Sequence, residues 1–320
     1  MGIQYLNKLI RTKCSGALKQ IPLSNLRKKV IVIDTSIYLY RFAGEGGIVD
    51  GMYQMISILL MNHIIPVFVF DGKPPPEKYD ILTKRKSEKK TAEEKTLEIQ
   101  NKIDDLLSKD IYADTSQLDF ELGEMKKKCL KISYRDTENV KELMKLMGVT
   151  YFIADGEADE LCAKLVIKKY AWAVLSEDMD MFVYGCNRVL RYLSLINNTV
   201  MLYNTREILK ILNLNQKQFR EICVLSGTDY NAAAESRITL DNTLKYFDKY
   251  RKRGKGKEFY IWMTENSDYI EDYYRLCSTY IMFEVQHLNI SKFEKQKIMN
   301  GPVNISLLHA FLEKFGFIFI

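Results

Sequence analysis

The sequence predicts an α/β fold with a mostly parallel central sheet and helices on both faces. Four apolar runs, rich in β-branched and aromatic residues, each stop near a carboxylate: Val30–Asp34, Val67–Asp71, Tyr151–Asp155 and Ala173–Asp178. They do not alternate with polar residues, which is typical of strands buried on both faces. Because the carboxyl ends of parallel strands meet at one edge of a sheet, we expect these acids to lie close together.

Composition sets the class of protein. The chain has 320 residues, of which 47% are hydrophobic, enough for a sizeable core. Its six cysteines are far apart and it has only three histidines, which argues against a structural zinc site and predicts reduced thiols in an intracellular protein. We see no signal peptide and no apolar stretch that could span a bilayer, so we expect no membrane association.

The first part of the chain, to about Pro76, has the pattern of a β-α-β unit, with helical periodicity over Tyr53–Met61 between the first two strands. The composition then becomes charged and helical over Glu77–Lys131, with a thin apolar stripe and a turn-prone break at Ala113–Ser116. This stretch predicts an insertion of two basic helical pieces above the sheet.

The α/β pattern resumes after the insertion. Asn139–Met147 predicts an amphipathic helix that Gly148 ends, and the third strand follows at once. Beyond Leu202 the pattern is mostly helical. The basic residues gather in three clusters, Lys84–Lys90, Lys126–Lys131 and Lys249–Lys257, apart from the acids. Separated charges favour an anionic polymer held on one surface and processed at another, although solvated helix faces explain such clusters equally well.

Three further acidic segments suggest chemistry. Gly156–Leu165 predicts a helix with three acids in its first turn, where the helix dipole alone would also favour them. Ser176–Asp180 places three carboxylates within four residues at a strand end, which packing explains poorly because acids are seldom buried without partners. In Leu225–Tyr230 a single aspartate closes a helical stretch, and a turn-forming role would suffice for it.

These acids together predict a metal site. Hard oxygen ligands without histidine or thiolate favour Mg²⁺ or Mn²⁺ over zinc or copper. Two such ions about 4 Å apart are the general solution for phosphodiester hydrolysis, because they activate water and neutralise the phosphate. The residues alone therefore favour a metal-dependent nuclease or phosphatase.

The motifs, taken in order, resemble the flap endonuclease family of structure-specific 5′ nucleases. They are Met1–Gln4, the Asp34 strand, Phe70–Pro75, Leu146–Val149, Gly156–Asp159, Glu177–Asp180 and Gly227–Tyr230. The resemblance is good to about residue 230 and weak beyond. It implies a PIN-like nuclease core with a helical arch insertion and a mainly helical C-terminal region. In that arrangement 1–320 is one nuclease domain, divided into an N-terminal nuclease region (1–76), the arch (77–138), an internal nuclease region (139–230) and a helical duplex-binding region (231–320).

The resemblance also implies a catalytic site with two Mg²⁺ ions, for which Mn²⁺ can substitute. It assigns metal ligation, direct or through water, to Asp34, Asp71, Glu157, Asp159, Asp178, Asp180 and Asp229. Asp159 stands where the family usually has Glu, so its shorter arm could shift a metal or admit a water. Lys78 and Arg85 match two cations at the base of the arch that draw the scissile phosphate to the metals. Without the resemblance they would be ordinary solvated helix charges.

DNA contacts are implied as well. Tyr40 matches an aromatic ring that stacks on the base beside the scissile bond, and Gly2 would lie near the DNA junction. Lys84, Lys128 and Lys131 are candidates for contacts between the arch and the single strand. Where this chain lacks the family's glycine-rich turn, duplex contacts would fall instead to Lys249, Arg251, Lys252 and Arg253, and they would be sensitive to salt.

Two departures from the family concern the C-terminal part. The family continues after Asp229 with a glycine-rich turn that holds a monovalent cation against the duplex, but Asn231–Leu240 contains no glycine. No sliding-clamp peptide is recognisable before Ile320. These features suggest a divergent, C-terminally short member of the kind found in a large DNA virus or a fast-evolving eukaryote.

The expected function is that of a structure-specific 5′ nuclease with flap endonuclease and 5′ exonuclease activity in DNA replication, repair or recombination. The expected substrate is DNA with a 5′ flap, gap or end. Two alternatives stay open: an RNA-directed or purely exonucleolytic relative, and a catalytically silent DNA-binding scaffold. We expect a monomer, in the nucleus or, if the protein is viral, at a cytoplasmic replication site.

Overall fold

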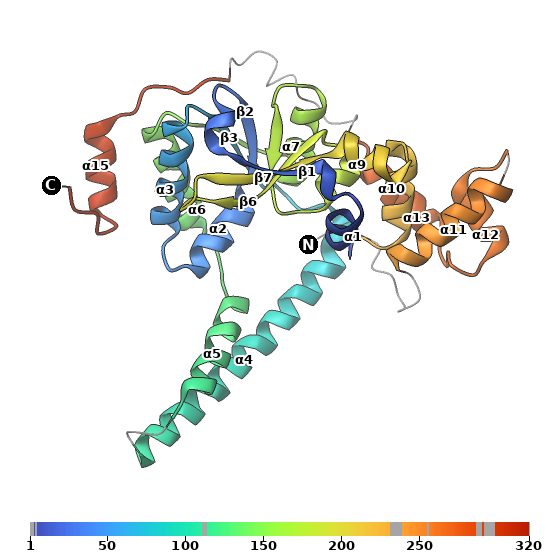
Figure 1. Cartoon of the computed structure of the whole chain (residues 1–320). Helices are drawn as coiled ribbons and strands as arrows, with labels where there is room; N and C mark the ends of the chain where they lie inside the picture. The colour runs from blue at the N-terminus through green and yellow to red at the C-terminus, as the bar shows by residue number, and fades with distance from the viewer. Residues whose placement is uncertain are drawn as a thin grey trace.

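The computed structural model describes residues 3, 5–110, 114–230, 239–254, 256–285, 290 and 298–319. Its centre is a seven-stranded sheet in the order β1-β7-β6-β5-β2-β3-β4 (Figure 1). The strands are β1 (Leu18–Pro22), β2 (Val30–Asp34), β3 (Ile65–Phe70), β4 (Thr150–Ile153), β5 (Ala173–Leu175), β6 (Arg188–Ser194) and β7 (Thr199–Asn204). All neighbouring pairs are parallel except the two that β7 makes with β1 and β6. The predicted mostly parallel α/β fold is confirmed.

Helices cover both faces of the sheet. One face carries α1 (Leu6–Lys13), α7 (Ala158–Ile167), α8 (Asp180–Tyr184), α9 (Thr205–Leu212) and α10 (Gln216–Leu225), and the other carries α2 (Thr35–Gly44), α3 (Ile48–Met61), α6 (Tyr134–Leu146) and α15 (Ile305–Glu313). Along β2, Val32 packs into the first layer, whereas Ile31 and Ile33 pack into the second. Both faces of this strand are therefore buried, which is why the sequence shows apolar runs without alternation.

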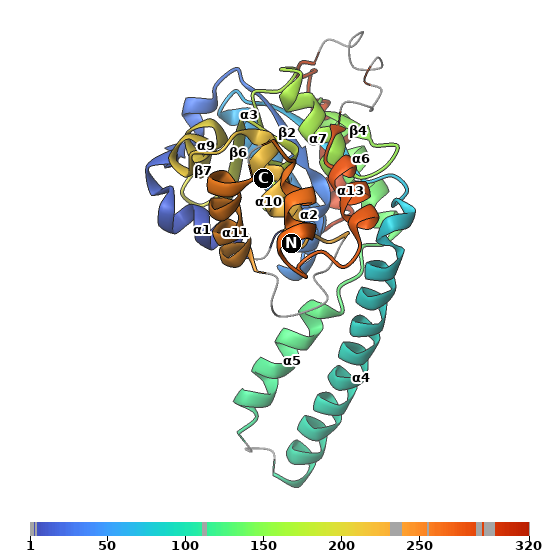
Figure 2. The ribbon, with the colours of Figure 1, turned by 90° about the vertical axis from the view of Figure 1, so that its right-hand side faces the viewer.

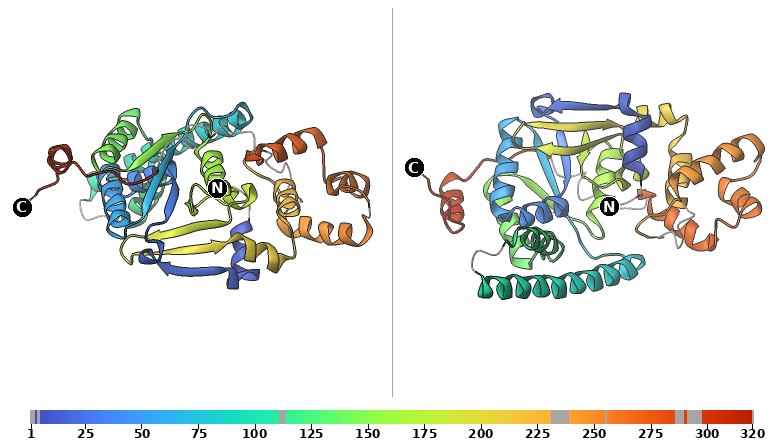
Figure 3. Two further views of the ribbon diagram at one scale, coloured as in Figure 1. Left: turned by 90° about the horizontal axis from the view of Figure 1, so that it is seen from above. Right: turned by 60° about the horizontal axis from the view of Figure 1, so that its bottom comes forward.

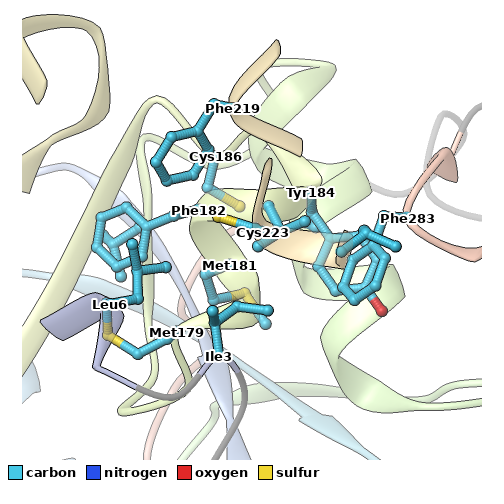
Figure 4. Packing of buried hydrophobic residues seen from close by; sticks show 14 of the residues in the cluster. Ile3, Leu6, Met179, Met181, Phe182, Tyr184, Cys186, Phe219, Cys223 and Phe283 are labelled. Carbon is cyan, nitrogen blue, oxygen red and sulfur yellow. The ribbon is translucent and has the colours of Figure 1, made fainter. Parts of the chain in front are cut away.

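The first layer extends beyond the sheet. Figure 4 shows Phe182 and Cys186, from α8 and the turn after it, packed with Phe219 and Cys223 of α10. Phe283 reaches the same layer, and its ring centroid lies 4.9 Å from that of Tyr184 in a tilted arrangement. Beyond α10 lie α11 (Leu240–Arg253), α12 (Phe259–Asn266) and α13 (Tyr273–Met282), so the predicted helical C-terminal region is confirmed. It stands at one end of the sheet, and α15 stands at the other (Figure 3).

The predicted insertion is a pair of helices that projects from the sheet (Figures 1 and 2). Helix α4 (Tyr79–Lys109) has 31 residues, follows the short 3₁₀ turn η3 (Pro76–Lys78) and packs against α5 (Ser116–Lys128). Only a few apolar side chains of the two helices are buried, such as Ala92 and Ile103 of α4 and Leu122 of α5. The pair is therefore held by a narrow seam, and most of its surface is exposed. Asp114 and Thr115 lie in the predicted break, whereas Ala113 lies outside the described residues.

Helix α6 begins earlier than the apolar periodicity predicts, at Tyr134 instead of Asn139. Ser133 explains the difference, because its hydroxyl accepts from the amide of Asp136 at 3.1 Å and the Asp136 carboxylate accepts from the Ser133 amide at 2.8 Å. Such reciprocal caps start a helix independently of the apolar stripe. The helix ends as predicted at Gly148, whose φ of 67° favours glycine. In the part of the chain described here, no helix is long and apolar enough to cross a membrane.

Candidate functional site

The carboxyl ends of β2, β3 and β5 bring the predicted acids to one edge of the sheet. Asp34 is the last residue of β2, Asp71 directly follows β3, and Asp178 comes three residues after β5. Strands β2 and β5 are neighbours, yet the chain leaves β2 toward β3 and β4 and returns to β5 on the other side. A reversal of this kind is where α/β folds form their sites.

Helix α7 brings the next acids to the same edge through Asp71. One oxygen of Asp71 accepts from the backbone amide of Ala158 at 2.9 Å, and the other accepts from the hydroxyl of Ser36. Ala158 is the first residue of α7, so its amide has no partner within the helix. Asp71 therefore caps α7 from a distance and fixes the turn that carries Glu157 and Asp159.

Asp178 and Asp180 are held by a serine after β5. The hydroxyl of Ser176 accepts from the Asp178 amide at 3.1 Å and donates to Asp34 at 3.3 Å, while Asp178 accepts from the Asp180 amide at 3.0 Å. The Oδ1 atoms of Asp159 and Asp180 are buried, and no group in the described residues donates a hydrogen bond to them. Buried carboxylate oxygens without donors are costly unless a cation or proton reaches them.

Burial also shifts the titration of these groups. It raises the pKa of Asp34 to about 7, and the charges of Asp71 and Asp178 add to the shift. Burial likewise raises the pKa of Asp178, and it raises those of Asp159 and Asp180 well above the usual range, with neighbouring carboxylates adding to the effect. We call Asp34, Asp159, Asp178 and Asp180 the inner acids. They crowd like charges into a site with little compensation, which favours a bound cation.

Two other acids already have cationic partners, and we call Glu157 and Asp229 the outer acids. Glu157 accepts from Lys78 Nζ at 2.5 Å, and Asp229 accepts from the guanidinium of Arg85 at 2.5 Å. Lys78 ends η3 and Arg85 lies in the second turn of α4, so the base of the projecting pair reaches the acidic edge. Burial opposes the charge of Lys78, but its pKa is raised because the attraction of Glu157, Asp159 and Asp180 outweighs that effect.

Tyr230 completes the contacts around Glu157. Its hydroxyl donates to the second oxygen of Glu157, and its ring centroid lies 4.9 Å from Lys78 Nζ. Sequence reasoning gave no role to Tyr230, nor to Ser36 and Ser176, although all three lie within two residues of an acid of the site. In the described residues no three acids form a ready-made metal site. The oxygen-only donors nevertheless fit a hard divalent cation, because Asp159 and Asp180 each have a buried oxygen that no group in the described residues satisfies.

One acid of the predicted cluster faces elsewhere. Glu177 pairs with Arg191 at 3.4 Å and accepts from the amide of Tyr192 at 2.5 Å, so it joins β6 and not the inner acids. The local sequence pattern does not distinguish Glu177 from Asp178 and Asp180.

The predicted DNA-binding residues are placed on several elements. Tyr40 is 52% exposed on α2, Lys84 is exposed on α4, and Lys128 is exposed at the end of α5. Lys131 pairs with Glu93 at 2.8 Å and so ties the end of the arch to α4. On α11 the basic side chains of Lys249, Arg251, Lys252 and Arg253 are exposed. Gly2 and most of the glycine-free segment Asn231–Leu240 lie outside the described residues.

Comparison with known proteins accounts for this arrangement. The model of the XPG N-terminal domain matches residues 1–92, and that of the XPG I-region matches residues 148–229. The chain belongs to the flap endonuclease and XPG family. Every inner and outer acid, Asp71, Lys78 and Arg85 fall within the two regions that the family models match.

Curated relatives agree with the family. The chain is 32% identical over 250 residues to flap endonuclease 1-B of Oryza sativa subsp. indica, covering 72% of this chain and 57% of that protein. It is 34% identical over 249 residues to flap endonuclease 1 of Aedes aegypti, covering 72% and 62%. The chain thus spans about three fifths of the length of these relatives.

Solved structures of the family share the fold. The catalytic core of Rad2 in complex with DNA substrate superimposes with a TM-score of 0.68 at 19% identity, over 98% of this chain and 94% of that one. Flap endonuclease-1 from Methanococcus jannaschii gives a TM-score of 0.63 at 21% identity, over 98% and 93%. The likeness also covers parts of the chain that the family models do not match, namely residues 93–147 and those beyond 229.

Proposed function

We propose that this chain is a divalent-metal-dependent, structure-specific 5′ nuclease that hydrolyses DNA phosphodiesters at junctions between single and double strands. The observation that carries the proposal is a contrast at the sheet edge. The inner acids are buried, and Asp159 and Asp180 each have an oxygen without a donor in the described residues, whereas the outer acids are paired with cations from the base of the arch. The first group suits metal ions, and the second keeps two cations within reach of a phosphate.

The residues that would hold the metal are the inner acids together with Asp71, Glu157 and Asp229, directly or through water. The donor set is entirely oxygen, so we propose Mg²⁺, with two ions as the natural number for so many carboxylates and Mn²⁺ as a substitute. When bound, such ions supply Lewis-acid charge and an activated water for phosphodiester hydrolysis.

Lys78 and Arg85 are the side chains that would bind the scissile phosphate. Without substrate, their charges are neutralised by Glu157 and Asp229 at 2.5 Å. A phosphodiester at the sheet edge competes with these carboxylates, because a guanidinium and an ammonium bind phosphate oxygens as well as carboxylate oxygens. The two cations would then draw the phosphate toward the acids and stabilise the charge that develops during cleavage.

The rest of the DNA would lie over the exposed aromatic and basic residues. Tyr40, exposed on α2, offers a stacking surface for a base next to the phosphate. Lys84 and Lys128 line the arch, and Lys249, Arg251, Lys252 and Arg253 present positive charge on α11 for a duplex. We propose a DNA substrate with a 5′ flap, gap or end, used in replication, repair or recombination.

A cleavage assay tests the proposal. Purified protein is incubated with 5′-flap DNA in Mg²⁺, beside the same reaction in EDTA and beside the variant Asp178→Ala. Incision near the junction that disappears in both controls is expected. Matched RNA-flap and blunt-duplex substrates, run in parallel, report the preferred polymer and structure. Tight flap binding by the wild-type protein without incision would overturn the proposal in favour of a silent DNA-binding protein.

A further inference from the structure

Strand β6 contains an irregularity beside the segment after β5 that carries Asp178 and Asp180. Its register with β7 runs regularly from Arg188 to Arg191 and then shifts before Ser194 pairs with Thr199. Tyr192, inside the shift, has a φ of 54°, a left-handed conformation that is an outlier for a bulky side chain. Bulges of this kind occur beside active sites, where they redirect a side chain.

The side chain that the bulge orients is Arg191, which is only 5% exposed. One terminal nitrogen donates to the backbone oxygen of Glu177 at 2.9 Å, and the other lies 2.9 Å from the sulfur of Met179. The guanidinium also pairs with the Glu177 carboxylate at 3.4 Å, and that carboxylate accepts from the Tyr192 amide at 2.5 Å. Arg191 and Tyr192 thus hold the segment after β5 in place through contacts with its backbone and its side chains.

The same guanidinium reaches a second element. The terminal nitrogen that contacts Met179 also donates to Oδ1 of Asn7 at 2.8 Å. The side-chain amide nitrogen of Asn7 in turn donates to the hydroxyl of Tyr192 at 2.8 Å. The bulge is joined to α2 as well, because Arg41 donates to the backbone oxygen of Leu193 at 3.1 Å. Helix α1, helix α2 and the segment after β5 are therefore all tied to three consecutive residues of β6.

The contacts alternate along the segment that carries the acids. Arg191 contacts Glu177 and Met179, whereas the intervening Asp178 and the following Asp180 are inner acids. We infer that Arg191 is a positioning residue for the proposed metal site: by holding residues 177 and 179 on the β6 side, it fixes Asp178 and Asp180 toward the other acids. The inference rests on the proposed function, since it concerns the geometry of that same site.

Substitution of Arg191 tests the inference through metal binding, measured by titration calorimetry with Mg²⁺ and by the rise in melting temperature that Mg²⁺ produces. Partners that orient metal ligands typically contribute 10–100-fold to metal affinity. We expect Arg191→Met to weaken Mg²⁺ binding by about 10–100-fold, with a matching rise in the Mg²⁺ concentration needed for half-maximal flap cleavage. Affinity for flap DNA in Ca²⁺ should change little, because Arg191 is only 5% exposed and presents little surface to DNA.

Arg188→Met is the matched control. Arg188 is on the same strand and lies over the ring of Trp172 at 4.7 Å, and within the described residues no hydrogen bond or ion pair joins it to the acidic segment. It should bind Mg²⁺ as the wild-type protein does. If Arg191→Met fails to fold in EDTA, Arg191→Lys and Glu177→Gln replace it: each keeps part of the contacts with this segment and should weaken Mg²⁺ binding by a smaller factor. Wild-type Mg²⁺ affinity in all the Arg191 and Glu177 variants that fold would overturn the inference, whereas absence of Mg²⁺ binding by the wild-type protein would instead overturn the proposed function.

Discussion

The inner and outer acids lie at one sheet edge but solve the problem of burying charge in different ways. Glu157 and Asp229 each have a cation from the base of the arch at 2.5 Å. Asp159 and Asp180 have buried oxygens with no donor in the described residues, and burial raises their pKa values well above the usual range. The difference teaches that buried carboxylates in one site can be compensated in two ways. The outer acids are neutralised by side-chain cations, for which a phosphate can compete, whereas the inner acids favour a metal ion or a proton.

The largest effect should come from neutralising an inner acid. Asp180→Asn should reduce flap cleavage by at least about a thousandfold, because it removes a metal oxygen, while flap binding in Ca²⁺ should be largely retained. The same change should raise the melting temperature in EDTA, since it removes a carboxyl group whose ionised form is costly to bury. Single-turnover cleavage and thermal melting measure the two results.

The matched outer-acid variant is Asp229→Asn, which should lower the melting temperature in EDTA slightly or leave it unchanged, because it breaks an existing ion pair. Equal stabilisation by both variants would show that the inner and outer acids do not differ in compensation. Retained cleavage by Asp180→Asn would remove Asp180 from the metal set.

A smaller effect is expected from the cations. Arg85→Ala should lower single-turnover cleavage by about 10²–10³-fold, the usual loss when one group that stabilises a developing oxyanion is removed. Its fold should be intact, because the side chain is 46% exposed. Lys86→Ala, an exposed neighbour on α4 without an acidic partner in the described residues, is the control and should cleave at nearly the wild-type rate. If the two variants cleave alike, Arg85 is an ordinary surface charge.

Substitution of Tyr40 tests a contact with the substrate instead of one with the metal or the scissile phosphate. Removal of its ring by Tyr40→Ala should weaken productive flap binding by about 5–150-fold, corresponding to the loss of roughly 1–3 kcal/mol of stacking. Tyr40→Phe retains the ring and should behave as the wild-type protein in KM and kcat. A loss in the Phe variant as large as that in the Ala variant would assign the effect to the hydroxyl and contradict stacking.

The smallest effect concerns a buried acid outside the site. Burial raises the pKa of Glu221, on α10, to about 7, although Lys217 at 3.8 Å opposes the shift. The folded protein therefore keeps a proton that the unfolded chain releases above about pH 4.5. Stability should fall as the pH rises from about 4.5 through about 7, and Glu221→Gln should remove this part of the pH dependence in chemical unfolding. A wild-type slope in the Gln variant would show that Glu221 is not its source.

The sequence predicted the parts of the fold that depend on apolar runs and on glycine. The runs ending at Asp34 and Asp71 became β2 and β3, and Gly148 ended α6 as expected. It did not predict β1, whose residues Leu18–Pro22 are mostly exposed at an edge and lack an apolar run. The first β-α-β unit also contains two helices where the periodicity indicated one, because α2 starts directly at the acid that ends β2.

The acids of the site could be predicted from the sequence, but which of them would face a metal and which pair with a cation could not. Sequence order named the acids, yet the distinction between Glu177, which turns to β6, and Asp178 depends on Arg191, a residue with no motif of its own. The pairing of Lys78 with Glu157 across the insertion likewise depends on how α4 leaves the sheet. Such contacts join residues far apart in the chain, and local patterns do not encode them.

The length of α4 gives the arch a mechanical property. At 1.5 Å per residue its 31 residues extend about 45 Å, whereas Arg85 lies only about 9 Å from the start of the helix. If the helix pivots at its anchored base, a movement of the tip is reduced about fivefold at Arg85 and the accompanying force is multiplied by the same factor. A DNA strand that pushes on the tip of the arch, far from the acids, would therefore exert a small displacement but an amplified force on the Arg85–Asp229 ion pair.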